Sequence, residues 1–254
     1  MLRNLAKERI KAGKPIVGAV VHFAAPDFIE MLGFAGLHWV FIDCEHGSMS
    51  EESVEGMVRA AEVSGITPIV RPPGDDPHVI LRYLDLGAQG LIIPHVETKE
   101  DAQAAVCNTK YYPLGERGVG RVRWSKWGTA GSEGELLAQA NEMTMIIALV
   151  ESAKGVENLP GILSVEGIDA IMIGPSDLSQ SLGLPCQYKH PKVQEYVGRI
   201  MDTCIADKKP VGMGFNNAEE GRNFVERGGS MVYINENFLI QNACRAYLRT
   251  VEGD

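Results

Sequence analysis

The sequence predicts an α/β fold, a single (β/α)₈ (TIM) barrel that spans residues 1–254. Eight short apolar segments alternate with helical segments at a nearly constant spacing, and no linker or low-complexity stretch separates them. Strict alternation favours parallel strands joined by right-handed crossovers, and eight such units close into a barrel. The length of 254 residues is typical of one barrel, although two smaller domains also fit it. An open doubly wound sheet is the structural alternative, but no glycine-rich dinucleotide fingerprint follows the first strand.

Each expected strand is a short continuous apolar run, which is typical of parallel strands buried on both faces. The runs IVGAVVHF and WVFIDCE are the first two, and the sixth run stops at the sequence GPSD. The eight expected strands are 16–23, 39–45, 67–70, 90–93, 145–150, 168–173, 211–215 and 231–234.

Proline, glycine and cap residues delimit the expected helices. An amphipathic segment over residues 1–14 precedes the first strand. Pro26 opens a helix that ends at glycine, and Ser50 caps the next helix, which has acids in its first turn. The remaining expected helices are 77–86, 99–109, 156–163, 193–208, 218–226 and 238–251.

One segment, residues 111–143, interrupts this alternation. It is predicted to be a long connection between the fourth helical unit and the fifth strand. Connections of this length in a compact barrel are usually functional or disordered. Its basic residues Arg117, Arg121, Arg123 and Lys126 concentrate positive charge in an acidic protein. Both a functional loop and a solvated surface loop remain open.

The composition limits the classes of function. The net charge of −9 argues against nucleic acid or an anionic membrane as the main partner. No apolar run approaches the length of a bilayer span, and the N-terminal segment lacks the apolar core of a signal peptide. The five cysteines are an odd number without a CxxC pair, so neither a disulfide framework nor a zinc site is indicated. We therefore expect a cytoplasmic protein.

Polar residues gather where the expected strands end. In parallel α/β folds ligands bind at the carboxyl ends of the strands, so these side chains are expected at one rim of the barrel. They are His22, Asp43, Glu45, His46, Arg71, His95, Glu151, Ser176 and Asp177.

These groups suggest a metal-assisted reaction of a 2-keto acid. Glu151 and Asp177 suit a hard divalent cation such as Mg²⁺, although each could instead cap the helix that follows it. Such a cation can polarise a keto carbonyl and stabilise an enolate, and Arg71 can add positive charge at the oxyanion. The backbone N–H groups of Ser176 and Asp177 can hold the substrate carboxylate.

Proton transfer is assigned to a histidine. His46, oriented by Asp43, can move the proton, because imidazole titrates near neutral pH. No lysine falls convincingly at a strand end, so a Schiff-base mechanism is the weaker choice.

Several motifs follow one another along nearly the whole chain. They are Asp43-x-Glu45-His46-Gly47, Val70-Arg71-Pro72, Leu86-Gly87-Ala88-Gln89-Gly90 with Ile93-Pro94, Glu116-Arg117-Gly118-Val119-Gly120, Val150-Glu151-Ser152, and Gly167-Ile168-Asp169 leading to Ile173-Gly174-Pro175-Ser176-Asp177-Leu178-Ser179. In these motifs and in their order the chain resembles the HpcH/HpaI aldolase/citrate lyase family, which contains metal-dependent class II pyruvate aldolases.

The resemblance implies reversible aldol cleavage of a 2-keto-hydroxy acid to pyruvate and an aldehyde through a metal-bound enolate. It implies Mg²⁺, Mn²⁺ or Co²⁺ at Glu151 and Asp177, enolate stabilisation by Arg71, and a proton-transfer pair of His46 and Asp43. It also implies homohexamers, built as trimers of dimers, in which neighbouring barrels exchange the C-terminal helix.

The chain departs from the common family pattern at two places. Many of these aldolases have Gln-x-Glu where this chain has Leu149-Val150-Glu151. Strand alternation points Leu149 to the same side as Glu151, so an apolar group replaces a polar one in the expected substrate site. They also commonly continue Glu-His-Ala-Pro-Asn, where this chain has Glu45-His46-Gly47-Ser48-Met49.

Two other functions remain open from the sequence. Decarboxylation of oxaloacetate, or a related lyase reaction, would use the same enolate and differs only in the group that leaves C3. A catalytically silent, oligomeric carboxylate-binding protein is the alternative of a different class, and the set of strand-end residues argues against it.

Overall fold

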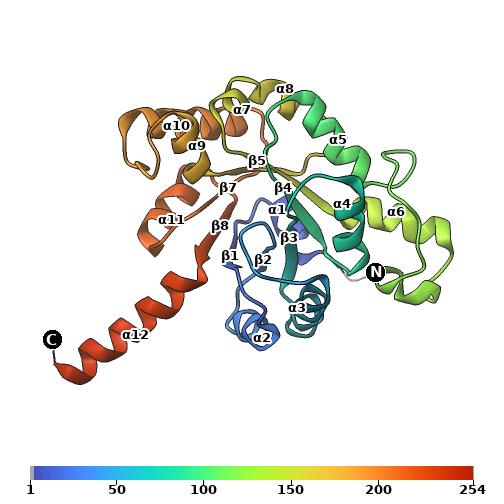
Figure 1. Ribbon diagram of the computed structural model, residues 1–254, viewed down its shortest axis with the longest axis horizontal. Coiled ribbons are helices and arrows are strands. Elements are labelled where there is room, and N and C mark those ends of the chain that lie inside the picture. Colours follow the sequence, from blue (N-terminus) through green and yellow to red (C-terminus); the bar gives the residue numbers. More distant parts are fainter. Residues whose placement is uncertain (1–2, 254) are drawn as a thin grey trace.

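The computed structural model, which describes residues 3–253, contains a closed barrel of eight parallel strands in chain order (Figure 1). The register Gly18↔Trp39 joins the first two strands, and Ile16↔Met231 closes the ring between the first and the last. The strands are β1 (Ile16–Val21), β2 (Trp39–Asp43), β3 (Thr67–Arg71), β4 (Gly90–Ile93), β5 (Met145–Val150), β6 (Ala170–Ile173), β7 (Val211–Gly214) and β8 (Met231–Asn235). The predicted barrel is thereby confirmed.

Most of the helices follow the strands and form the outer layer of the barrel. Ser50 caps the helix that follows β2 by accepting a hydrogen bond from the Ser53 N–H, as expected. The helices are α1 (Leu5–Lys11), α2 (Pro26–Phe34), α3 (Glu51–Ser64), α4 (Pro77–Asp85), α5 (Lys99–Thr109), α6 (Glu133–Met143), α7 (Ala153–Glu157), α8 (Leu159–Leu163), α9 (Pro175–Ser181), α10 (Pro191–Ala206), α11 (Ala218–Glu226) and α12 (Glu236–Glu252), together with the 3₁₀ helix η1 (Arg123–Gly128). Met1 and Leu2 of the expected N-terminal segment lie outside the described residues.

Two expectations about helices were wrong. The single helix predicted over 156–163 is the pair α7 and α8, which meet at Asn158. Pro160 lies in the first turn of α8, where its missing N–H is tolerated but where a continuous helix would be broken. The segment 111–143 is also not one long loop, because η1 and α6 occupy much of it.

The strands carry two apolar surfaces. Alternate residues face the inside of the barrel, where Trp39, Phe41 and Tyr233 pack with ring centroids 5.4–6.3 Å apart. The other set faces the helices and forms the larger apolar cluster. Because successive side chains of a strand point to opposite faces, this alternation determines which residues at the strand ends point into the mouth of the barrel.

The N-terminal end of the barrel is closed by α1. The Asn4 side-chain amide donates to the carbonyls of Gln89 and Met143, and the Ala6 N–H donates to Thr67 Oγ1. Ala6 itself is fully buried against the interior cluster. The opposite, carboxyl end of the strands is therefore the one that remains for a site.

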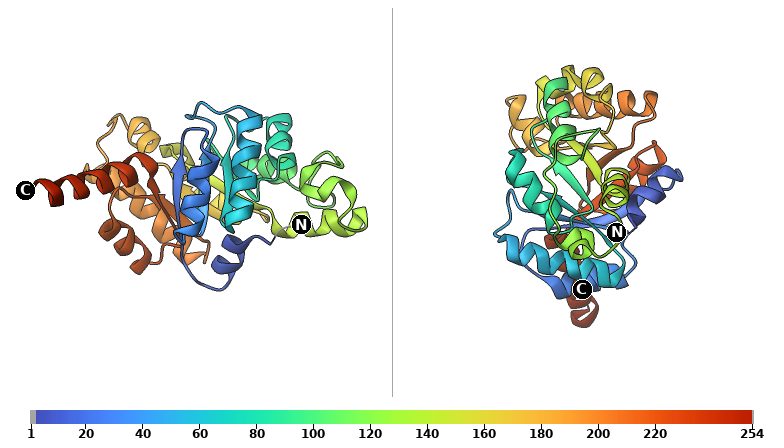
Figure 2. Two further views of the ribbon diagram at one scale, coloured as in Figure 1. Left: turned by 90° about the horizontal axis from the view of Figure 1, so that it is seen from below. Right: turned by 90° about the vertical axis from the view of Figure 1, so that its right-hand side faces the viewer.

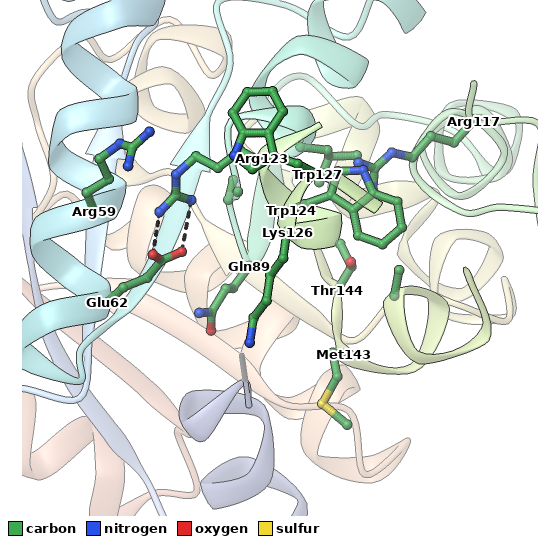
Figure 3. Close-up of a pocket in the computed structure, with 14 residues that line it drawn as sticks. Arg59, Glu62, Gln89, Arg117, Arg123, Trp124, Lys126, Trp127, Met143 and Thr144 are labelled. Carbon is green, nitrogen blue, oxygen red and sulfur yellow. Dashed lines mark hydrogen bonds and ion pairs between the residues drawn. The ribbon is translucent and has the colours of Figure 1, made fainter. Parts of the chain in front are cut away.

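The arginines of the segment 111–143 are paired with acids. Arg117 contacts Asp85 at 2.9 Å, Arg121 contacts Glu133 at 2.6 Å, and Arg123 contacts Glu62 at 2.9 Å. A hollow of about 350 Å³ lies between Arg59, Arg123, Trp124 and Lys126, as Figure 3 shows. Gln89 and Thr144, which line it, precede β4 and β5, so the hollow lies at the closed end of the barrel and away from the strand-end residues.

The C-terminal helix α12 extends away from the barrel instead of packing on it, on the side opposite η1 and α6 (Figures 1 and 2). Its apolar residues Tyr247, Leu248 and Val251 are exposed. Between residues 3 and 253, no helix is both long and apolar enough to cross a membrane.

Candidate functional site

The ends of the strands bring seven charged or titratable side chains into one chain of contacts at the mouth of the barrel. It begins at the base of α12 and ends at the end of β5. In order, its members are Glu236, His22, Asp43, Arg71, Glu45, His95 and Glu151.

Asp43 and Arg71 form the centre of this chain. They are register partners at the ends of β2 and β3, and both point into the barrel. Arg71 Nε lies 2.9 Å from Asp43 Oδ1, and Arg71 Nη2 lies 2.5 Å from Oδ2. Arg71 Nη1 contacts Glu45 Oε2 at 3.0 Å, and the guanidinium lies over the Phe41 ring at 5.3 Å. These contacts hold the planar guanidinium in one orientation.

Both members of this pair are charged. Burial acts to raise the pKa of the fully buried Asp43, but hydrogen bonds from His22 and Arg71 outweigh it and bring the pKa below its usual value. Burial likewise acts to lower the pKa of Arg71, but the hydrogen bond to Asp43 and the negative charges of Asp43 and Glu45 together outweigh it, so the pKa is raised. Removing either partner would leave an uncompensated buried charge.

The imidazole that contacts Asp43 belongs to His22 and not to His46, contrary to the expected pair. His22 Nε2 lies 3.1 Å from Asp43 Oδ2. The contact of His46 with Asp43 that the structure gives is through its backbone N–H, 3.4 Å from Oδ1. Gly47 permits the tight turn after β2, because a Cβ there would lie 2.2 Å from the Asp43 carbonyl oxygen. The His46 side chain is exposed.

Glu151 lies at the end of β5 and is almost fully buried. Its Oε1 accepts a hydrogen bond from the His95 N–H at 3.0 Å and contacts His95 Nδ1 at 3.1 Å. His95 adopts a φ of 53°, which is uncommon for a residue with a side chain. That backbone conformation turns both its N–H and its ring toward Glu151, while Nε2 lies 3.4 Å from Glu45 Oε1.

Gly174 makes the space that the Glu151 carboxylate occupies. A Cβ at position 174 would lie 2.7 Å from the Cβ and 2.8 Å from Oε2 of Glu151. Asp177 follows in the first turn of α9 and is half-buried, and the described residues give its carboxylate no hydrogen bond or ion pair. Ser176 precedes it and is exposed.

The charges around Glu151 fit a bound cation. Burial raises the pKa of Glu151; the N–H and the charge of His95 oppose this, while the negative charges of Asp177 and Glu45 add to it. A buried carboxylate with two further acids nearby is stabilised by a cation that neutralises them. Two carboxylates with room for substrate oxygens and water are a donor set that hard divalent cations accept.

Leu149, the residue that departs from the family pattern, lies inside the barrel below Glu151. It is 3% exposed and belongs to the interior apolar cluster. A Cβ at Gly174 would lie 3.3 Å from Leu149 Cδ1, which places the leucine beside the Glu151 carboxylate space. It forms part of the apolar floor of the mouth.

A second hollow, of about 970 Å³, extends from the mouth past the ends of β6, β7 and β8 toward α10 and α11. Ser176, Gly214, Tyr233 and Asn235 line the part next to the strand ends. Because Ser176 directly precedes Asp177, this space can take the part of a substrate that extends beyond the strand ends.

Sequence reasoning did not identify Glu236. The C-terminal helix expected from the sequence begins at residue 238, and the set of strand-end residues expected from the sequence stops at Asp177. The rule that located the other residues, a polar side chain directly after a strand, applies to Glu236 as well, because β8 ends at Asn235.

Comparisons with known proteins agree with this architecture. The family model HpcH/HpaI aldolase/citrate lyase matches residues 18–234. The chain is 34% identical over 235 residues to the 4-hydroxy-2-oxo-heptane-1,7-dioate aldolase of Salmonella paratyphi B, which covers 92% of this chain and 88% of that protein.

Solved structures give the same result. An HpcH/HpaI aldolase/citrate lyase family protein from Burkholderia cenocepacia has a TM-score of 0.92 and 30% identity, covering 98% of this chain and 99% of that one. The citrate synthase SbnG has a TM-score of 0.88 and 30% identity, covering 99% and 98%. The chain therefore belongs to the HpcH/HpaI aldolase/citrate lyase family and is a carbon–carbon lyase.

Proposed function

We propose that the protein cleaves a 2-keto-4-hydroxy acid to pyruvate and an aldehyde, and forms it in the reverse direction. The observation that carries the proposal is the arrangement of the mouth, where the fixed guanidinium of Arg71 lies in one chain of contacts with the buried Glu151. The Salmonella relative, named for its aldolase activity on 4-hydroxy-2-oxo-heptane-1,7-dioate, supports the substrate class.

Glu151 and Asp177 would hold a divalent cation. When bound, a divalent cation of the type that this donor set accepts polarises the keto carbonyl and balances negative charge at its oxygen. Mg²⁺, Mn²⁺ and Co²⁺ all fit the oxygen donors of this pair.

The protein's own residues supply the other requirements of the cleavage. The proton of the C4 hydroxyl must leave, the C3–C4 bond breaks, and its electron pair ends on the C2 oxygen as an enolate. The positive charge of Arg71 stabilises the negative charge that develops on this oxygen. The first-turn N–H groups of Ser176 and Asp177 can hold the C1 carboxylate. His46, whose side chain is exposed and whose backbone N–H contacts Asp43, is proposed to receive the hydroxyl proton and to return a proton to C3 of the enolate.

A screen of reactions tests this proposal. The purified protein with Mg²⁺, Mn²⁺ or Co²⁺ is given pyruvate and a panel of aldehydes, and 4-hydroxy-2-keto acids are tested in the cleavage direction. We expect aldehyde and pyruvate in equal amounts. Release of CO₂ from oxaloacetate without aldehyde turnover would favour the decarboxylase alternative, and carboxylate binding without turnover would favour a binding protein.

Replacing His46 with alanine is expected to lower proton transfer by about 10²–10⁴-fold, the usual contribution of a general acid–base group. Pyruvate affinity should change little, because the keto acid is held by other groups. Exchange of the pyruvate methyl protons in D₂O measures the step directly. His78→Ala, at an exposed histidine in the first turn of α4, is the matched control. Undiminished exchange in His46→Ala would assign the base to another group.

Leu149→Gln is expected to shift the ranking of acceptor aldehydes toward polyhydroxylated ones. The apolar floor that Leu149 forms cannot pair with a buried hydroxyl, and leaving such a group unpaired costs about 1–3 kcal/mol. Competition between aldehydes for the same enzyme measures the ranking, and Leu149→Met is the control that keeps the floor apolar. An unchanged ranking would mean that Leu149 only fills the barrel interior.

We also propose that α12 is exchanged between subunits in a homo-oligomer, a hexamer built as a trimer of dimers. Tyr247, Leu248 and Val251 on α12, and Met31 and Phe34 on α2, are exposed apolar side chains that a neighbouring copy would cover. Sedimentation analysis tests the state directly, and a monomer at micromolar concentration would contradict it. A cytoplasmic location is consistent with the five free cysteines.

A further inference from the structure

His22 lies between two buried carboxylates that come from distant parts of the chain. Its Nε2 lies 3.1 Å from Asp43 Oδ2, and its Nδ1 lies 3.0 Å from both Glu236 Oε1 and Oε2. Asp43 is fully buried and Glu236 is 1% exposed, while the His22 side chain is 28% exposed toward the mouth. The imidazole therefore joins β2, β1 and the base of α12.

With both carboxylates ionised, the geometry favours a proton on each ring nitrogen. A neutral imidazole carries one N–H, so one of its nitrogens would direct a lone pair at a carboxylate about 3 Å away. The imidazolium ion donates to both carboxylates and balances part of their charge. The hydrogen bond to Asp43 and the charge of Glu236 raise the pKa of His22, in agreement with this geometry.

Glu236 is more than an acid that stabilises a helix N-terminus. First-turn acids of that kind are usually solvated, as Glu219 is at the start of α11. Glu236 occupies the same type of position in α12, but it is buried, and both of its oxygens face His22. A buried carboxylate is retained at a cost in desolvation, and the His22 contact offsets that cost.

We propose that His22 and Glu236 are positioning residues that hold the Asp43–Arg71 pair in the orientation needed at the substrate oxyanion. Asp43 Oδ2 accepts from Arg71 on one side and from His22 on the other, so its carboxylate is fixed from both directions. Arg71 in turn depends on Asp43 for two of its contacts. Small displacements of such groups reduce turnover strongly, because stabilisation of a developing charge depends on alignment.

The expected effect of His22 and Glu236 on turnover rests on the proposed lyase reaction. The expected protonation of His22 does not. Protonation of both ring nitrogens of His22 is observable in the enzyme without substrate. The ¹⁵N and ¹H signals of labelled histidine distinguish an imidazolium from the two neutral tautomers. We expect His22 of the wild-type protein to remain an imidazolium at pH 7.5, where an ordinary histidine with a pKa near 6.5 is mostly neutral. His22→Ala identifies the signal by removing it.

The variants Glu236→Gln and His22→Ala test the expected effect on turnover. Each should lower kcat by about 10–100-fold, the size usual for groups that orient another residue, with a smaller change in KM for pyruvate. Glu236→Gln should also move the alkaline limb of the pH–rate profile to lower pH, because it removes one of the two carboxylates that face His22; Arg71 and Glu45 lie beyond Asp43 and are unchanged. The double variant should be no slower than His22→Ala alone, because His22 and Glu236 both act through the Asp43 carboxylate.

Glu219→Gln is the control for Glu236, because it removes an acid from the first turn of another helix. It should leave kcat, the pH profile and the histidine signals unchanged. Circular dichroism and Tm show whether each variant is folded.

The possible outcomes separate this inference from the proposed function. A neutral His22 at pH 7.5, or folded variants with kcat within about two-fold of wild type, would overturn the positioning role. An imidazolium signal in a protein that turns over none of the keto acids or aldehydes would contradict the proposed reaction while supporting the contacts of a protonated His22 with Asp43 and Glu236. The expected result is the imidazolium signal together with a loss of kcat and the shifted pH profile.

Discussion

Replacing Glu151 with glutamine is expected to lower kcat by about 10³-fold or more while the barrel remains folded. The substitution removes one of two carboxylates proposed to hold the cation, and with it most of the charge stabilisation at the keto oxygen. Glutamine has nearly the same size, so it fits the space beside Gly174. The measurements are kcat with saturating Mg²⁺ or Mn²⁺ and the cation affinity by calorimetry. Glu157→Gln, at an exposed acid at the end of α7, is the matched control.

The same variant separates loss of a ligand from loss of the fold. The pKa of Glu151 is raised, mainly by burial, so its ionised form is less stable in the folded protein than in the unfolded chain. The contribution of Glu151 to the free energy of unfolding is therefore fully present at a pH below the ordinary pKa of glutamate. It is lost as the pH rises through the raised pKa of Glu151 in the folded protein. Glutamine removes the charge, so the metal-free Tm at neutral pH should stay the same or rise. Full activity in thoroughly demetallated wild-type protein would contradict the metal role.

Arg71→Lys is the second large effect, with an expected loss of kcat of about 10²–10³-fold. Lysine keeps the positive charge but loses the planar fork through which Arg71 contacts Asp43 twice and Glu45 once. The remaining ammonium ion cannot hold these contacts and face the oxyanion at the same time. Because a cation stays beside Asp43, the fold should survive, whereas Arg71→Ala should cost about 3–5 kcal/mol by leaving a buried charge unpaired.

Comparison of kcat and of urea unfolding for the two variants checks this prediction. Arg82→Lys, which alters an exposed ion pair with Glu51, is the control and should change neither quantity by much. Near-wild-type turnover in Arg71→Lys would assign stabilisation of the oxyanion to other groups.

The sequence was sufficient for the barrel and for most of the residues at its mouth, with Glu236 as the exception. Eight apolar runs alternating with helices favour a closed parallel barrel, and β4, β5, α5 and α11 have the bounds expected from the sequence. The ends of the strands follow from where the apolar runs stop. Asp43, Arg71 and Glu151 therefore lie at one mouth because strand ends in a parallel barrel share one side.

The segment 111–143 shows where local patterns were weaker. Its glycines and charges indicate a loop, yet α6 forms across GELLAQAN, which has only a few apolar residues for the core. Leu136 and Ala140 are the buried residues of that helix. A helix that buries so little surface gives a weak periodic signal, and packing on the barrel decides its formation.

The choice of imidazole for Asp43 was decided by the tertiary structure. The spacing Asp43-x-x-His46 suggests a local pair, but the tight turn at Gly47 leaves the His46 side chain exposed. His22 instead continues the inward-facing set of β1, which includes Ile16 and Val20, and so points into the mouth. Alternation along the strand governs side-chain direction more strongly than closeness in sequence.

The contact of Glu236 with His22 depended on closure of the ring. The two residues are 214 positions apart and meet because β8 pairs with β1, with Asn235 opposite Val20. The sequence by itself determined the eight strands, their apolar faces and most of the polar residues at their ends. These features follow from the spacing of apolar residues and from the residues that end each apolar run, which are patterns of only a few residues. The tertiary structure alone decided which of those end groups touch, because the first and last strands become neighbours only when the barrel closes.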